Sequence, residues 1–361
     1  MVIYFVYYFA LLAIGLYFHV LGLLKAKGGK ITYLSIVWLT LTLISGLRSF
    51  SMSYDAYAYA SVFDYFADVP WMMPWDYSHF MEYGFYVLCK TISSFGGTAR
   101  VMFFLTSGFI AFAICRFLYK NAEDLLLSVL LLLSFPYFYT SFDLIRHYIA
   151  VSIVLLAFEF VKQRRFWCFL GCVVVAMLFQ KIAVVMLLFY WMPKIKWNPL
   201  TVSGAVAFTL LVMLFPRQII AVLSYLFNDY KSYVSGGNVH WFGRFSGGTK
   251  TALMYFVILV IAVLAFQNKD RTNLRNHQSL GYVIAVLSMA IVYMNASMAI
   301  RLLVAFLPFL SVGLADLLDD RECHNQGTQV FLRCTTIAIS IAYHAYLIIN
   351  DWQNIVPYAI F

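Results

Sequence analysis

The sequence predicts an all-α, polytopic membrane protein, and three properties of the 361-residue chain lead to this fold class. Hydrophobic residues make up 63% of the chain and charged residues only 11%, whereas an average soluble domain carries about 25% charged residues. Apolar runs of roughly 20 residues, the length at which a helix crosses a bilayer, recur along the chain. The 25 Lys and Arg outnumber the 16 Asp and Glu. This composition excludes a water-soluble enzyme, a nucleic-acid-binding protein and a disordered chain.

The apolar runs define the expected spans. They lie at about 2–24, 31–50, 99–119, 123–140, 142–161, 199–226, 250–266, 279–296, 299–317 and 334–350. Together with a segment that folds back on itself, described below, they predict about 11–12 transmembrane helices with re-entrant segments. We expect residues 1–361 to form one integral membrane domain.

Basic loops between the runs set the expected orientation. Cytoplasmic loops of membrane proteins carry an excess of Lys and Arg, and Lys25, Arg165 and Arg271 mark three of the short basic loops in this chain. If these loops are cytoplasmic, both termini lie on the outer side of the membrane. The outward loops are then about 51–82 and 227–249.

Two segments must not cross the membrane if this orientation is kept. Gly84–Gly97 is short and contains Lys90, which favours a re-entrant or interfacial helix. Residues 166–192 could cross once, but Gln180 and Lys181 lie in the middle of the stretch. An unpaired Lys at that depth costs about 2.5–3.5 kcal/mol. We therefore expect two apolar arms that turn near Gln180 and Lys181.

The remaining cations break the orientation rule, because they fall at the outward ends of spans or in outward loops. They are Arg48, Lys90, Arg100, Arg146, Lys181, Arg217, Lys231, Arg244, Lys250 and Arg301. An anionic ligand on the outer side would explain them. The first outward loop is rich in Tyr, Trp and Asp, which suit a sugar, although Trp and Tyr also gather at bilayer interfaces.

Charged residues inside spans are costly and mark candidate sites. Arg48 ends the second span, Arg146 and His147 lie one turn into the fifth, and Arg301 lies two residues inside the run at 299–317. Simpler interpretations stay open: Arg48 could extend to the interface, Arg301 could pair with a structural carboxylate, and Asp143 could be an N-cap.

Several guanidinium groups near the outer leaflet indicate a ligand that combines phosphate with an apolar tail, because the planar donor fork of Arg matches phosphate. A polyprenyl-pyrophosphate sugar donor has this chemistry. Glycosyl transfer from such a donor needs stabilisation of the leaving pyrophosphate and a carboxylate or His as general base. A nucleotide-sugar donor is disfavoured, since it is cytoplasmic and the sequence contains no cytoplasmic domain.

Short motifs along nearly the whole chain resemble one family. They are Gly46-Leu47-Arg48, Tyr54-Asp55-Ala56-Tyr57, Glu82-Tyr83-Gly84-Phe85, Arg146-His147-Tyr148-Ile149-Ala150, Ala176 to Ala183, Asn228 to Tyr233, Arg301 and Pro357-Tyr358. The chain is similar in these motifs to the EpsG-type, Wzy-like polymerases of bacterial surface polysaccharides. It departs from them at His147, where the family more often has Gln, and at Gln180, where it usually has His. His147 could have taken over the role of the missing His.

The resemblance implies an inner-membrane, metal-independent glycosyltransferase of the C-type superfamily (GT-C). Such an enzyme joins O-antigen or exopolysaccharide repeat units on undecaprenyl pyrophosphate at the periplasmic face. The implied partners are the lipid-linked oligosaccharide and the bilayer, with a chain-length regulator as an optional further partner. No cofactor and no nucleic acid is expected.

These arguments assign candidate site residues. The expected catalytic residues are Asp55, as the first choice of base, followed by Glu82 and His147. The expected pyrophosphate- and sugar-binding residues are Arg48, Arg146, Lys181, Gln180, Arg301, Arg244 and Tyr57.

Three other functions stay open at this point. A flippase for lipid-linked oligosaccharides would also bind phosphate, but its cations should line a path to both leaflets. An O-antigen ligase shares the donor and the leaflet, and composition does not separate it from a polymerase. A membrane acyltransferase would use an embedded His, for which His147 is the candidate.

Overall fold

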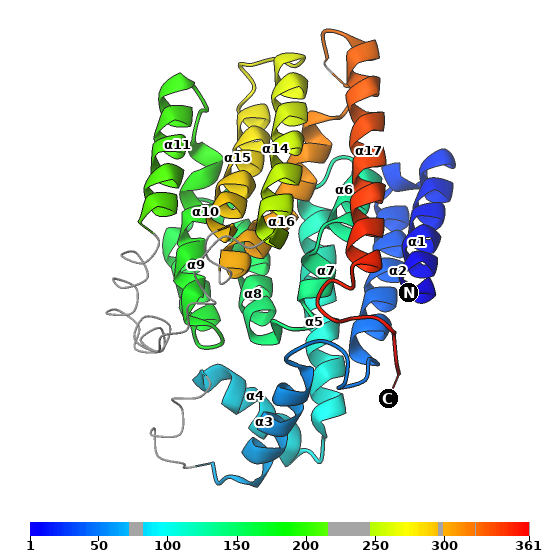
Figure 1. Cartoon of the computed structure of the whole chain (residues 1–361), viewed down its shortest axis with the longest axis vertical. Helices are drawn as coiled ribbons and strands as arrows, with labels where there is room; N and C mark the ends of the chain where they lie inside the picture. The colour runs from blue at the N-terminus through cyan, green and yellow to red at the C-terminus, as the bar shows by residue number, and fades with distance from the viewer. Residues whose placement is uncertain (72–81, 216–245, 295–298, 322, 361) are drawn as a thin grey trace. The chain divides into compact units, whose positions relative to one another are not determined.

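The computed structural model describes residues 1–71, 82–215, 246–294, 299–321 and 323–360, and these residues form helices and no β-sheet (Figure 1). The chain divides into two compact units. The first comprises Met1–Tyr190 and Ile339–Phe361, and the second comprises Trp191–Ala338. Helix α17, Gln326–Ile349, begins in the second unit and ends in the first.

The first unit contains the N-terminal helices and most of the predicted site. Its elements are α1 (Val2–Val20), η1 (Leu23–Lys25), α2 (Lys27–Gly46), α3 (Ala56–Asp68), α4 (Tyr83–Ser94), α5 (Ala99–Asn121), α6 (Leu125–Ser134), α7 (Tyr137–Thr140), α8 (Ile145–Lys162), α9 (Phe166–Met177) and η3 (Lys181–Leu187). Helix α10, Leu188–Trp191, closes the unit. Helix α5 packs against both α2 and α8.

The second unit is a bundle of apolar helices. Its elements are η4 (Met192–Lys194), α11 (Pro199–Leu214), α14 (Ser246–Gln267), α15 (Leu274–Tyr293), α16 (Ile300–Leu317) and the first part of α17. Helix α15 packs against α11, α14 and α16. Asn caps define two of the starts: the Asn198 side chain accepts from the Thr201 N–H, and that of Asn273 accepts from the Arg275 N–H.

The described residues confirm the all-α class, and six of their helices are long and apolar enough to cross a membrane, which is consistent with a multi-pass membrane protein. They are Val2–Val20, Lys27–Gly46, Ala99–Asn121, Thr249–Gln267, Ile300–Leu317 and Gln326–Ile349. Each overlaps one of the runs expected from the sequence. The run expected at 199–226 is described only to residue 215.

The run expected at 123–140 is not one helix, because Pro136 interrupts it. Helix α6 ends at Ser134, and Phe135 is extended, with φ −83° and ψ 163°. Proline disfavours helical backbone in the residue before it, so the chain breaks there and resumes as the four-residue helix α7. The short α6 and α7 replace the single span expected here.

A cluster of apolar side chains joins α3 and α4 to the starts of α5 and α8. Its buried members are Ala56, Tyr59, Ala60, Phe63, Phe66, Phe85, Cys89, Ile92, Ala99, Met102, Phe103, Ile145 and Ile149. Figure 1 shows α3 and α4 side by side at the end of α5 where that helix begins. This cluster fixes the position of the segments that carry Asp55, Glu82 and Arg146.

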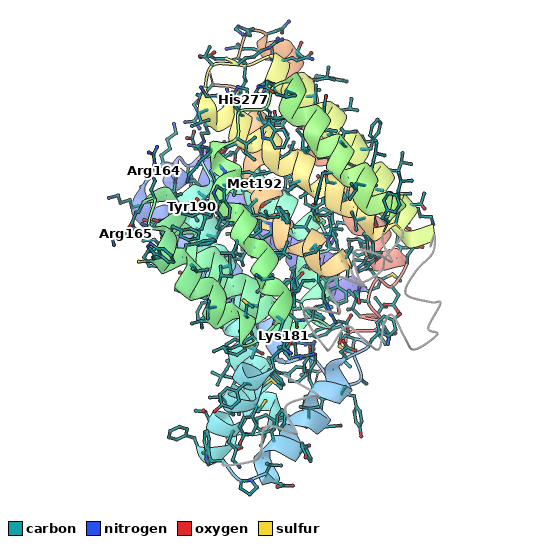
Figure 2. The ribbon with its side chains drawn as sticks, turned by 90° about the vertical axis from the view of Figure 1, so that its left-hand side faces the viewer. Arg164, Arg165, Lys181, Tyr190, Met192 and His277 are labelled. Atoms are coloured by element: carbon teal, nitrogen blue, oxygen red, sulfur yellow. The ribbon has the colours of Figure 1, made fainter. Side chains whose placement is uncertain are left out.

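The segment after α8 folds back, as its sequence predicts. Helix α9 ends at Met177, Gln180 is extended, and η3 and α10 lead the chain back. The Tyr190 hydroxyl then donates to the Arg164 carbonyl (3.1 Å), and the rings of Tyr190 and Phe166 lie 5.1 Å apart. Figure 2 shows Tyr190 beside Arg164, at the open end of this hairpin. Lys181 lies at the opposite end, where the chain turns.

Candidate functional site

The loop that carries Asp55 is held by Asp143, which lies just before α8. Asp143 is 4% exposed, and its Oδ1 accepts the backbone N–H of Tyr54 (2.6 Å) and of Asp55 (3.2 Å). Hydrogen bonds to an ionised acceptor are stronger than neutral ones. The backbone at the start of α3 is therefore fixed, while the side chain of Asp55 stays exposed at the N-cap position.

The interpretation of Asp143 as a helix N-cap is wrong. The N-cap of α8 is Leu144, with no side-chain capping bond, and the Asp143 carboxylate bonds to the loop before α3 instead. The two partners lie 89 and 88 positions away in the sequence. Asp143 is thus a site residue that the sequence analysis did not assign.

Arg146 and Glu82 form an ion pair at the junction of α8 and α4. Their side chains are 18% and 10% exposed. Arg146 is the second residue of α8, where the positive end of the helix dipole opposes a cation, so a nearby carboxylate offsets that cost. The Tyr59 ring centroid lies 6.0 Å from the guanidinium carbon. Arg146 Nε is buried and has no hydrogen-bond partner among the described residues.

Backbone contact places the turn of the α9–η3 hairpin against the start of α4. The Gly84 N–H donates to the Leu178 carbonyl (2.8 Å). A Cβ at Gly84 would lie 2.7 Å from that carbonyl oxygen. This is too close for any residue other than Gly unless the two backbones separate. The structure thereby brings Gln180, which is buried, and Lys181, which is half-buried, to the region of Glu82.

Arg48 is inside the protein rather than at its surface. It is 1% exposed. Its guanidinium donates to the Ser45 carbonyl, to the Ser45 hydroxyl (3.1 Å) and to the Phe142 carbonyl (2.9 Å). The guanidinium carbon lies 4.7 Å from the ring centroids of both Phe103 and Phe142. Arg48 thus ties the end of α2 to the segment before α8.

The C-terminal segment after α17 covers this loop. The Ser49 N–H donates to the Ala359 carbonyl (2.9 Å), and the Ser53 N–H donates to that of Asn354 (3.0 Å). The Tyr358 hydroxyl donates to the Ile44 carbonyl at the end of α2 (3.0 Å). The C-terminal segment therefore binds residues 44–53, while the Phe142 carbonyl accepts from Arg48 and Ser53 and Asp143 binds residues 54–55.

The other predicted residues are more dispersed. His147 is 1% exposed, and its ring packs edge-on against Tyr148. Tyr57 projects from α3 and is 72% exposed. Arg301 is half-buried in the first turn of α16, in the second unit. Arg244 and most of the outward loop 227–249 lie outside the described residues, as do residues 72–81 of the first outward loop.

Tyr59 is a second residue that the sequence analysis did not assign to the site. It is 5% exposed in the apolar cluster, and its ring faces Arg146. A Tyr two residues after Tyr57 in an aromatic-rich helix carries no signal that separates it from core residues. Among the described residues, no three His, Cys, Asp or Glu side chains are grouped so that they could hold a metal ion.

The fold is that of an all-α protein with six apolar helices, consistent with a multi-pass membrane protein, and acidic and basic residues lie where α3, α4 and α8 begin. Comparison with protein families gives a more specific result. The model of the EpsG family matches residues 31–360, so the chain belongs to the EpsG family and the resemblance seen in the motifs is confirmed. Membership suggests a role in exopolysaccharide biosynthesis. The curated proteins and the solved structures give no match.

Proposed function

We propose that this protein is a polysaccharide polymerase. It joins oligosaccharide repeat units carried on undecaprenyl pyrophosphate, at the periplasmic face of a bacterial inner membrane, by a glycosyltransferase reaction. The observation that carries the proposal is the placement of an exposed carboxylate, Asp55, and a paired guanidinium, Arg146, on segments that one apolar cluster holds together. Membership of the EpsG family supports the same function.

In the proposed reaction the acceptor sugar hydroxyl attacks the anomeric carbon of the donor. A new C–O bond forms as the bond from that carbon to the pyrophosphate oxygen breaks, and undecaprenyl pyrophosphate leaves with the electron pair. The hydroxyl proton passes to a base. Charge therefore accumulates on the pyrophosphate in the transition state, and a cation placed there accelerates the reaction.

Arg146 is the proposed pyrophosphate ligand, with Lys181 assisting. Arg146 lies at the N-terminus of α8, where the helix dipole and a guanidinium both favour an anion. The Arg146 Nε–H donates to no acceptor within the described residues, so the guanidinium has a donor left for a phosphate oxygen. Glu82 holds the guanidinium when the site is empty, and we assign it a positioning role.

Asp55 is the proposed general base. Its side chain is exposed, whereas His147 is buried and Glu82 is already paired with Arg146. Asp143 holds the backbone of Asp55, which limits the positions that the carboxylate can adopt. Accurate placement of a base accounts for much of its contribution to a rate.

The remaining assignments complete the proposal. Arg48, enclosed by Ser45, Phe103 and Phe142, positions the loop before α3 and does not contact substrate. Gln180, Tyr57, Arg301 and Arg244 stay predicted substrate-binding residues. We further propose a GT-C arrangement with re-entrant 84–97 and 166–192 segments and periplasmic termini.

The test uses the full-length protein, purified in nanodiscs, with the lipid-linked repeat unit of the host polysaccharide as both donor and acceptor. The proposal predicts a ladder of lengthened lipid-linked chains and release of undecaprenyl pyrophosphate. A second arm supplies a lipid A core acceptor. Transfer to that core without chain lengthening would instead identify a ligase. In cells, deletion of the gene should leave surface glycans capped by a single repeat unit.

A further inference from the structure

A cavity lies in the second unit, among α11, α14 and α15, and its volume is about 580 Å³. This is within the range of pockets that enclose a small ligand, roughly 300–1,000 Å³. The residues that line it are Trp197, Asn198, Val206, Thr209, Leu210, Leu259, Val263, Phe266, Gln267, Arg271, Leu280, Ile284, Leu287, Ser288 and Ile291. None of these belongs to the proposed polymerase site.

The polarity of the cavity changes along its length. Asn198, Gln267 and Arg271 lie at one end, because the start of α11, the end of α14 and the start of α15 meet there. The Trp197 N–H donates to His277 Nδ1 (3.1 Å), which joins the chain before α11 to α15. Away from this end most of the lining is aliphatic. The cavity is therefore amphipathic, with one polar end, which we call the mouth.

The dimensions suit one chain of a lipid. Along α15 the lining runs from Leu280 to Ile291, which at about 1.5 Å per residue is about 16 Å. That is about half of the roughly 30 Å hydrocarbon core of a bilayer. A cavity of one-leaflet depth with one polar end matches an acyl or prenyl chain below its headgroup.

The charge at the mouth favours an anionic headgroup. Arg271 is exposed and forms no ion pair with any carboxylate in the described part of the chain. Asp270, its neighbour, is engaged by Thr272, whose backbone N–H and hydroxyl each donate to Oδ1 (2.8 Å). These hydrogen bonds lower the pKa of Asp270. A guanidinium without a protein anion is suited to bind phosphate.

The mouth is also held in a defined shape. His277 Nε2 lies 2.8 Å from the Arg271 carbonyl oxygen, and the His277 ring packs edge-on against Phe266. Trp197 packs its indole onto the backbone of Gly281, where any Cβ would collide with it. Trp197 Nε1 is buried without an acceptor among the described residues. A ligand oxygen at this end would supply one.

We propose that this cavity binds one hydrocarbon chain of an anionic, phosphate-bearing lipid, with the phosphate at Arg271. The expected orientation puts the mouth at the cytoplasmic leaflet, since Lys269, Arg271 and Arg275 lie in the same short basic loop. Two sources share this chemistry: an anionic phospholipid and a polyprenyl phosphate. The site is separate from the proposed periplasmic chemistry and does not depend on polymerase activity.

Photo-crosslinking tests the proposal on the full-length protein in nanodiscs. The probes are phosphatidylglycerol and phosphatidylcholine with the same diazirine-bearing chain, and a diazirine-bearing undecaprenyl phosphate. Labelled peptides are mapped by mass spectrometry. We expect labelling within α11, α14 and α15 by at least one anionic probe, about ten-fold above phosphatidylcholine, as expected for a charge-assisted contact. The probe that labels more strongly identifies the source of the lipid.

Matched variants locate the ligand within the cavity. Val263→Trp fills the space between the helices and should abolish labelling, whereas Val260→Trp, on the exposed side of the same helix, should not. Arg271→Gln should lower anionic labelling about ten-fold, and Arg271→Lys should keep most of it. Because Arg271 is exposed, its variants should fold even if Val263→Trp does not. Equal labelling by anionic and zwitterionic probes, or labelling that Arg271→Gln leaves unchanged, would overturn the proposal.

Discussion

The carboxylate of Asp143 lies 3.2 Å from the backbone nitrogen of Asp55 and binds the N–H groups of Asp55 and Tyr54 through one oxygen. A buried carboxylate next to α8 thereby determines where α3 begins. In the proposed polymerase this contact connects the element with the pyrophosphate ligand, Arg146, to the element with the base. The geometry of the reaction would then depend on a residue that does not touch substrate.

Variants of Asp143 should show how far the stability of the protein and its elongation activity depend on the hydrogen bonds that hold the Asp55 backbone. Asp143→Ala removes both hydrogen bonds and should destabilise the protein by about 1–3 kcal/mol while strongly lowering chain elongation. Asp143→Asn keeps an acceptor oxygen and should be intermediate in both. Thermal unfolding in detergent and the elongation assay measure the two effects. An Asp143→Ala protein with full activity would remove Asp143 from the account.

The Arg146–Glu82 pair predicts a difference between two substitutions. Arg146→Ala should lower the elongation rate by about 10²–10³, the size seen when one transition-state donor is lost. Glu82→Gln should lower substrate binding and turnover by less than Arg146→Ala does, because the Arg146 guanidinium remains. Arg165→Ala serves as the control, since Arg165 is an exposed cation at the N-cap of α9, beyond the far end of α8. Unchanged elongation in Arg146→Ala would exclude Arg146 as the pyrophosphate ligand.

Arg48 and Arg146 should respond differently to replacement by Lys. Arg48→Lys loses the fork that binds Ser45 and Phe142 and the stacking on two rings, so it should cost about 2 kcal/mol of stability. Arg146→Lys keeps a cation beside Glu82, so it should change the melting temperature less than Arg48→Lys and slow elongation. An Arg48→Lys protein that melts normally but does not elongate chains would place Arg48 in contact with substrate.

Gly84→Ala tests the contact between α4 and the hairpin turn. The added Cβ would lie 2.7 Å from the Leu178 carbonyl oxygen, so the two backbones must separate, at a cost of about 1–3 kcal/mol. Gly171→Ala is the control, because a Cβ there has no neighbour within 4 Å and Ala favours a helix. The thermal stabilities of the two variants decide the point, and equal values would contradict the close approach.

Local pattern predicted much of this fold, and long-range contacts account for most of what it missed. Six apolar runs and the return of the chain at Gln180 followed from length, composition and a Lys in an apolar stretch. The contacts of Asp143 with residues 54–55, and of the C-terminal segment with residues 44–53, join positions far apart in the sequence. Periodicity and propensity carry no information on such pairs. The break at Pro136 was a local signal that the assignment of a single span overlooked.

The same division applies to the candidate site. Outward charge placement led to the assignment of Asp55, Glu82 and Arg146 as candidates, and the structure holds their segments together. The sequence did not show that Arg48 is enclosed, because burial of a guanidinium depends on the Phe103 and Phe142 rings that pack around it. Tyr59 was missed for a related reason, since one Tyr among many gives no signal until its ring is placed.

The most direct test of the central claim is the initial rate of chain elongation on purified lipid-linked repeat units by Asp55→Asn, compared with Asp64→Asn. Both residues are exposed carboxylates of the α3 region, and of the two only Asp55 lies at the Asp143 contact that joins the start of α3 to the segment before α8. The account predicts that Asp55→Asn slows elongation by about 10²–10⁴, the contribution of a general base, whereas Asp64→Asn leaves it unchanged. Normal elongation by a folded Asp55→Asn protein would contradict it.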